Sequence, residues 1–178
     1  MDGKTVCFSG HRPEKLPCRD ENSPQTNRLK SLLYKEIYDC IQDGYVNFVT
    51  GLAKGIDNWA ADMVIEFMSK NDKLRLICVM PYADYGKNRK GFDKWELSHI
   101  IEKASEVIVA SPDYSKHCMR LRNEKMVDLS DRLVAVVIDY KSGTGQTIRY
   151  AQKKGIETRI IDISADKMFF TEKNDVII

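Results

Sequence analysis

The sequence predicts an α/β fold of three layers, in which a mostly parallel sheet of about six strands is flanked by helices. Short apolar and β-branched runs alternate with amphipathic helical patterns along the chain. Several of these runs are apolar at consecutive positions, which is typical of strands covered on both faces. Because neighbouring parallel strands need a crossover connection, the alternation favours helices on both faces of one sheet. The 178 residues suit a single domain, with no visible repeat or linker.

Each predicted strand is a short apolar run bounded by turn residues. The six runs are 5–8, 46–50, 74–80, 106–110, 133–138 and 158–162. The first helix is marked by Ser23-Pro24 at its start and by Gly44 just after its end. The second has the clearest amphipathic spacing, and three more are predicted; these four occupy 56–68, 97–104, 124–129 and 147–154.

Composition excludes several classes of protein. The formal net charge is only +2, from 28 basic and 26 acidic side chains, so we expect no nucleic-acid partner, although a local basic patch stays open. No charged leader precedes a long apolar segment, and the longest apolar run, 133–138, is too short to span a bilayer, so no membrane association is expected. Five cysteines without C-x-x-C spacing are typical of reduced thiols in a cytoplasmic protein. The three histidines have no metal-ligand spacing, so we predict no metal site.

The first predicted strand ends in Ser9 and Gly10, which are followed by His11 and Arg12. In an open parallel sheet, ligands bind beyond the carboxyl ends of the strands. These four residues offer a hydroxyl, backbone N–H groups, a titratable ring and a guanidinium that binds phosphate in a bidentate manner. The alternative is a turn with a solvated arginine and a capping histidine. We favour a ligand site.

The second predicted strand leads into the glycine-rich stretch 51–57, directly before the best helix. Gly51, Ala53 and Gly55 permit close approach of the backbone to a ligand, and a helix N-terminus favours an anion. Asp57 lies in the first turn of that helix. It either accepts a hydrogen bond from a ribose hydroxyl or complements the helix dipole, and the sequence leaves both open.

A second predicted anion site follows the fifth strand, where Gly143, Thr144, Gly145 and Thr147 precede a helix predicted to start near residue 146. In one interpretation, an arginine of the stretch 120–131, between the two glycine-rich loops, reaches across to a phosphate. The alternative is a solvated helix face, which we favour for Arg120. The candidates from that stretch are Arg122, Asn123 and Asp131.

The third predicted strand is followed by Pro81 and Tyr82, and Tyr82 is a candidate for stacking on a base. The basic stretch 86–91 is bracketed by glycines, so it is either a lid over phosphates or an ordinary solvated loop. Neither a G-x-x-x-x-G-K-[ST] nor a G-x-S-x-G motif is present, which argues against P-loop and nucleophile-elbow chemistry.

Taken together, the F-S-G-H-R-P motif at 8–13, the stretch 51–57 and the series from Arg122 to Gly145 resemble the YpsA-like branch of the SLOG superfamily. The resemblance runs from about Val6 to Gly155. It implies a Rossmann-like fold and a site that binds or senses a nucleotide-derived ligand, ADP-ribose-like or NAD-related. The resemblance implies that the protein requires no cofactor beyond this ligand.

The same superfamily includes the Lonely Guy phosphoribohydrolases and the DNA-processing protein A, which binds single-stranded DNA. The Lonely Guy enzymes carry P-G-G-x-G-T-x-x-E at the second anion site, where the glutamate is catalytic. Aligned on Thr147, that glutamate falls on Tyr150, which cannot supply a carboxylate. This difference favours ligand binding over catalysis. A phosphoribohydrolase-like enzyme, with Asp57 or Asp131 as the carboxylate, and a single-stranded DNA binder are the alternatives.

The tail, residues 164–178, carries apolar groups that fit an edge hairpin, an interface or a loosely docked end. A homodimer is therefore left open, and the sequence does not identify the ligand.

Overall fold

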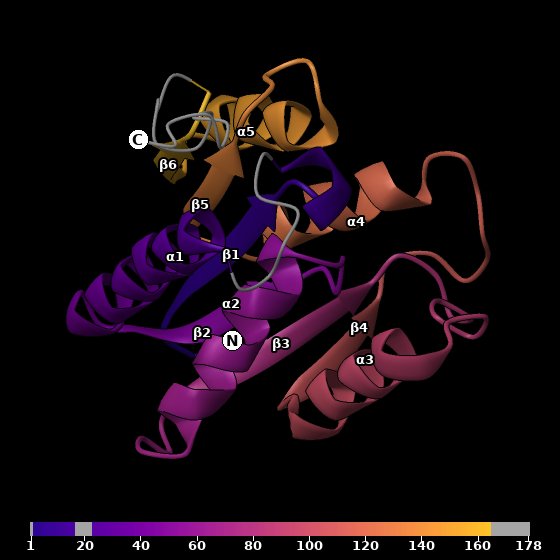
Figure 1. Ribbon diagram of the computed structural model, residues 1–178, viewed down its shortest axis with the longest axis horizontal. Coiled ribbons are helices and arrows are strands. Elements are labelled where there is room, and N and C mark those ends of the chain that lie inside the picture. The colour runs from indigo at the N-terminus through magenta and orange to yellow at the C-terminus, as the bar shows by residue number, and fades with distance from the viewer. Residues whose placement is uncertain (1, 17–22, 165–178) are drawn as a thin grey trace, which may run out of the picture.

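The computed structural model describes residues 2–16 and 23–164 (Figure 1). The strands are β1 (Lys4–Gly10), β2 (Tyr45–Thr50), β3 (Arg75–Met80), β4 (Glu106–Val109), β5 (Arg132–Val137) and β6 (Glu157–Asp162). The helices are α1 (Pro24–Gln42), α2 (Ile56–Met68), α3 (Gly91–Lys103), α4 (Cys118–Asp128) and α5 (Gly143–Lys154), with a short 3-10 helix, η1 (Pro13–Lys15). The six strands form one sheet in the order β4-β3-β2-β1-β5-β6, and every neighbouring pair is parallel. The predicted three-layer Rossmann-like fold is confirmed.

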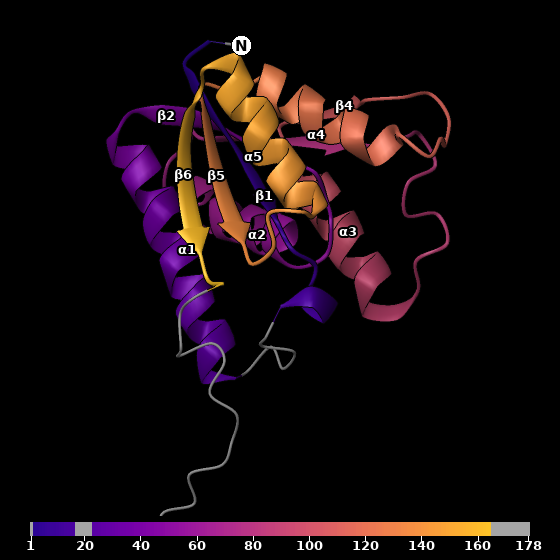
Figure 2. The same ribbon diagram turned by 90° about the horizontal axis from the view of Figure 1, so that it is seen from above.

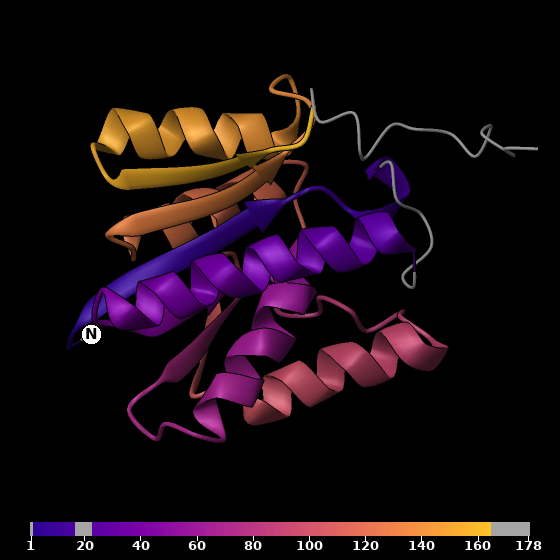
Figure 3. The ribbon, with the colours of Figure 1, turned by 60° about the vertical axis from the view of Figure 1, so that its left-hand side comes forward.

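Helices cover both faces of the sheet. α1, α2 and α3 lie side by side across one face (Figures 1 and 3), while α5 lies along β5 and β6 with α4 beside it (Figure 2). Successive residues of β1 alternate between the two layers, as a strand requires. Val6 and Phe8 pack into the core beneath α1–α3, whereas Cys7 packs into the core beneath α4 and α5.

The residues predicted to mark the start and the end of α1 lie at those positions in the structure. Ser23 is its N-cap and its Oγ accepts a hydrogen bond from the Thr26 N–H at 3.1 Å, with Pro24 in the first turn. The helix stops before Gly44, which has a φ of +84°. None of the helices within residues 2–16 and 23–164 has the length and apolarity needed to cross a membrane.

Three helices begin earlier than predicted. α3 starts at Gly91 rather than at residue 97. α4 starts at Cys118 rather than near residue 124. α5 starts at Gly143, because the Ser142 hydroxyl accepts a hydrogen bond from the Gly145 N–H at 3.3 Å and caps the helix there. Residues 143–146 are therefore the first helical turn and not a loop before it. The predicted tail, apart from Ser164, lies outside the described residues.

The strand order reverses at β1, since β2, β3 and β4 extend to one side and β5 and β6 to the other. At such a reversal the connections leave β1 and β5 toward opposite faces, and a crevice opens at the carboxyl ends of these strands. The candidate site lies there.

Candidate functional site

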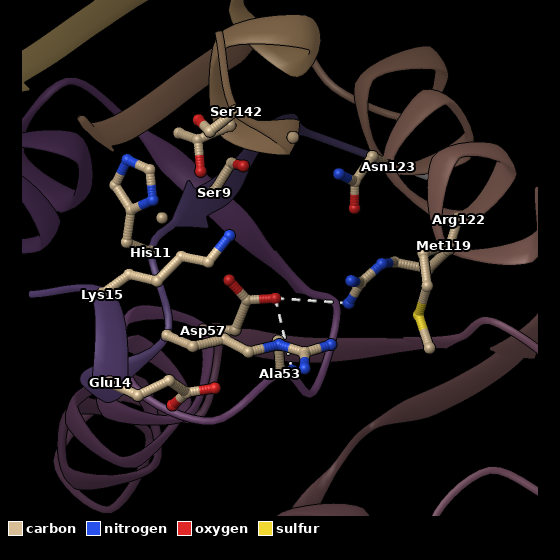
Figure 4. A pocket seen from close by; sticks show the side chains of 14 residues that line it. Ser9, His11, Glu14, Lys15, Ala53, Asp57, Met119, Arg122, Asn123 and Ser142 are labelled. Carbon is tan, nitrogen blue, oxygen red and sulfur yellow. Dashed lines mark hydrogen bonds and ion pairs between the residues drawn. The ribbon is translucent and has the colours of Figure 1, made fainter. Parts of the chain in front are cut away.

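A cavity of about 260 Å³ opens at the carboxyl ends of β1 and β5 (Figure 4). Five segments that are far apart in the sequence supply its walls: the end of β1, η1, the β2–α2 turn, α4 and the start of α5. The lining residues are Ser9, Gly10, His11, Arg12, Glu14, Lys15, Ala53, Asp57, Met119, Arg122, Asn123, Ser142, Gly143 and Thr144.

Asp57 and Arg122 form a buried ion pair in the wall of the cavity. Both side chains are only 7% exposed, and Asp57 Oδ2 lies 3.3 Å from Arg122 Nη1. The same oxygen accepts a hydrogen bond from the Ala53 N–H at 3.4 Å. Burial raises the pKa of the Asp57 carboxyl, and the Arg122 charge opposes that shift. Figure 4 shows the second carboxylate oxygen turned away from Arg122.

Two arginines from separate segments hold consecutive carbonyls of the β2–α2 turn. Arg122 Nη1 donates to the Gly51 carbonyl, and a Cβ at position 51 would overlap the guanidinium, so this contact requires glycine. Arg89 Nη2 donates to the Leu52 carbonyl at 3.0 Å, and the Tyr85 hydroxyl donates to it at 3.3 Å. Among the described residues, Leu52 is the one non-glycine residue with a positive φ, +62°. Such a conformation costs about 1–3 kcal/mol and persists where surrounding contacts enforce it.

His11 connects β1 to the β5–α5 loop. Its Nε2 accepts a hydrogen bond from the Asp139 N–H at 3.4 Å, which requires the neutral ring. Burial and the nearby Lys15 charge lower the pKa of His11, while Asp139 opposes them. The side chain is buried, so it serves as a wall of the cavity and a link between two loops.

The N-terminus of α5 opens onto the cavity. Its first intrahelical bond runs from the Gln146 N–H to the Ser142 carbonyl at 3.0 Å, so helix geometry leaves the N–H groups of Gly143 and Thr144 without an acceptor inside the helix. A Cβ at Gly143 would meet no atom within 4 Å. This helix end combines free donors, a positive partial charge and open space, which together suit an anion.

The remaining predicted residues lie beside the cavity or away from it. Four predicted residues do not line the cavity: Gly51, Gly55, Gly145 and Thr147. Asp131 lies at the amino end of β5, opposite to the cavity, and its Oδ2 accepts a hydrogen bond from the Thr5 N–H at 2.8 Å. We therefore leave Asp131 out of the candidate site.

Pro81 and Tyr82 are also separate from the cavity. The Tyr82 ring packs edge-on against Tyr85 at 5.6 Å and Tyr114 at 5.4 Å, rather than facing a ligand. In the stretch 86–91, for which the sequence left a lid or a solvated loop open, Arg89 Nη2 donates to the Leu52 carbonyl, so this arginine supports the β2–α2 turn.

Four lining residues are missing from the sequence-based candidates: Glu14, Lys15, Met119 and Ser142. The signal for Glu14 and Lys15 is Pro13, which starts the 3-10 turn that directs them to the cavity. Ser142 carries the N-cap signature of a serine before a helix. Met119 has no such signal. Within the described part of the chain, no three histidine, cysteine, aspartate or glutamate side chains gather to hold a metal ion.

Comparison with known families identifies the family of this chain. The YpsA family model, described as the YspA SLOG family, matches residues 6–167. The chain belongs to this family. Relatives of this SLOG protein include UPF0398 proteins of Bacillus cereus strains G9842 and B4264, which are 25% and 24% identical over 177 residues. Each alignment covers 98% of this chain and 95% of the relative.

Two solved structures share the fold of this SLOG protein. The DNA processing protein A (DprA) of Streptococcus pneumoniae superposes with a TM-score of 0.59 at 19% identity, over 91% of this chain. The DNA processing protein A of Helicobacter pylori, whose structure was solved to explain its single-stranded DNA binding mode, superposes with a TM-score of 0.58 at 21% identity, over 88% of this chain. This chain spans 51% and 64% of those two proteins.

Proposed function

We propose that the cavity binds the phosphate–ribose part of a nucleotide or nucleotide derivative, ADP-ribose-like or NAD-related. The observation that carries this proposal is the convergence of the α5 N-terminus with three cationic side chains, Arg12, Lys15 and Arg122, around one cavity. Helix donors and arginine forks are the groups that proteins use for phosphate.

The carboxylate in the same cavity argues for a sugar beside the phosphate. Asp57 repels a bare anion, yet its second oxygen accepts a hydrogen bond well from a hydroxyl group. A ribose phosphate satisfies both ends of the cavity, because its phosphate meets the cations and the helix end while its hydroxyls meet Asp57. Inorganic phosphate meets only the cations and the helix end, because it has no sugar hydroxyls to meet Asp57.

Isothermal titration calorimetry with ribose 5-phosphate, AMP, ADP-ribose and NAD tests the proposal. Lys15→Gln is expected to weaken binding at least tenfold, because it removes a cation from the cavity. Lys153→Gln removes the same charge from the exposed last turn of α5 and is expected to leave affinity unchanged. Gly143→Ala adds a methyl group to open space and is expected to weaken binding without lowering stability. Absence of binding by all four ligands overturns the proposal.

The same samples separate recognition from hydrolysis. Release of free adenine from AMP, abolished by Asp57→Asn, favours the phosphoribohydrolase-like alternative. Recovery of intact AMP after prolonged incubation favours binding alone.

Binding of single-stranded DNA is a second candidate. It is supported by the cationic side chains of the cavity and by Tyr114, which is 71% exposed in the loop after β4 and offers a face for base stacking. The fold is shared with a protein whose structure describes single-stranded DNA binding. Fluorescence polarisation with a labelled oligonucleotide tests this candidate: affinity that falls steeply with salt supports it, and the absence of binding at low salt excludes it.

A further inference from the structure

A second pocket, of about 240 Å³, adjoins the cavity between α4 and α5. Met119, Asn123 and Gly143 line both spaces. Because these three residues line both spaces, the cavity and the pocket are neighbours at the start of α5. A ligand with its phosphate at the α5 N-terminus can therefore place another group in the α4–α5 pocket.

The α4–α5 pocket differs in chemistry from the cavity. Tyr150 contributes an aromatic ring and Met119 a polarisable thioether, while Asn123 and Gln146 contribute carboxamides. The Asn123 Nδ2 donates to the Thr147 hydroxyl at 2.9 Å, so the amide is oriented and its oxygen remains an acceptor. An aromatic face together with an oriented amide is how proteins recognise a nucleobase by stacking and by its edge.

The Tyr150 ring is held in place before any ligand arrives. Its hydroxyl donates to Asp128 Oδ1 at 3.0 Å, and the same oxygen forms an ion pair with Lys154 at 2.7 Å. The ring is half-buried between α4 and α5, so one part packs against the core while another lines the pocket. A ring fixed in this way loses little conformational freedom on binding.

We propose that the α4–α5 pocket is a base subsite that takes an amino-bearing purine, with the ring on Tyr150 and the exocyclic amino group donating to the Asn123 oxygen. This inference rests on the proposed function of the cavity and names the group attached to its ribose phosphate.

Calorimetry with ribose 5-phosphate and AMP tests the subsite on wild-type protein, Tyr150→Ala and Tyr150→Phe. We expect AMP to bind wild-type protein at least tenfold more tightly than ribose 5-phosphate. Stacking on an aromatic ring accounts for roughly 5- to 150-fold in affinity. Tyr150→Ala should therefore remove most of the AMP advantage and leave ribose 5-phosphate binding unchanged. Tyr150→Phe keeps the ring and should stay within about threefold of wild type for both ligands.

A second measurement needs no variant. Inosine monophosphate carries an oxo group in place of the amino group of AMP, so it should bind wild-type protein more weakly than AMP. Equal affinities for AMP and ribose 5-phosphate, or equal affinities for AMP and inosine monophosphate, overturn the base subsite while the ribose-phosphate cavity stands. Absence of binding by every ligand overturns both.

Discussion

Replacing Arg122 with methionine tests whether the buried ion pair holds the β2–α2 turn. The guanidinium donates to two groups, Asp57 Oδ2 at 3.3 Å and the Gly51 carbonyl. Methionine has a similar length but no donor, so the variant leaves a buried carboxylate and a carbonyl without this partner. Removing one member of a buried pair costs about 3–5 kcal/mol, since the remaining charge is uncompensated.

The double variant Arg122→Met, Asp57→Asn provides the matched control. It removes both charges, so the penalty for an isolated buried carboxylate is absent. We expect it to be more stable than the sum of the two single variants implies, with a coupling of at least about 1.5 kcal/mol.

Urea unfolding of the wild type, both single variants and the double variant measures this coupling. The Ala53 N–H, which also donates to Asp57, should exchange faster with solvent in Arg122→Met because the carboxylate is no longer held. Additive effects within about 0.5 kcal/mol refute the reasoning, because they show that Asp57 and Arg122 do not stabilise one another.

Three further outcomes follow from the same structure. Arg89→Met should lower stability by about 1–3 kcal/mol and speed hydrogen exchange in the turn around Leu52, whose carbonyl it binds; unchanged exchange there contradicts this role. Because the pKa of His11 is lowered in the folded protein, the unfolded chain takes up a proton at a higher pH than the folded protein does. The contribution of His11 to stability is therefore fully present above pH 6.5, the ordinary pKa of histidine, and is lost as the pH falls through the folded pKa. In urea unfolding at pH 7 and pH 5, His11→Gln should therefore show a smaller loss than wild type, and equal losses would exclude His11 as the cause. Gly145→Ala should destabilise by about 1–3 kcal/mol in thermal unfolding, because its Cβ overlaps the Tyr140 carbonyl, and wild-type stability would show that the helix start can shift.

The central strands β1, β2, β3 and β5 were predictable because each buries a run of apolar residues. β5 is buried at every position, and its unbroken apolar run follows from cover on both faces. α4 shows why one boundary was missed. Its buried side is formed by Cys118, Arg122, Met126 and Val127, while Leu121 is 40% exposed. Arg122, which forms the buried ion pair with Asp57, occupies the stripe that an apolar side chain normally fills, so the hydrophobic period is broken at this position.

The structure brings together predicted residues at the carboxyl ends of the strands: Ser9 and Gly10 end β1, and Gly143 begins α5 after the β5–α5 loop. The structure places Asp131 outside the cavity, because this residue directly precedes β5 and so lies at the amino end of a parallel strand. Tyr82 follows β3 and also lies outside the cavity, because the path of a loop depends on packing partners such as Tyr114 that sequence spacing does not reveal.

Glycine patterns alone overstate how many residues meet a phosphate. In a sequence, Gly51, Gly143 and Gly145 have the same interpretation, close approach of a ligand to the backbone. In the structure, a Cβ at 51 would overlap the Arg122 guanidinium and a Cβ at 145 would overlap the Tyr140 carbonyl, so the protein's own packing already requires glycine at both. At Gly143 no atom lies within 4 Å of the added Cβ, and the position lines both the cavity and the α4–α5 pocket. A methyl group at 143 therefore tests the proposed ligand binding, whereas one at 51 or 145 tests the stability of the fold.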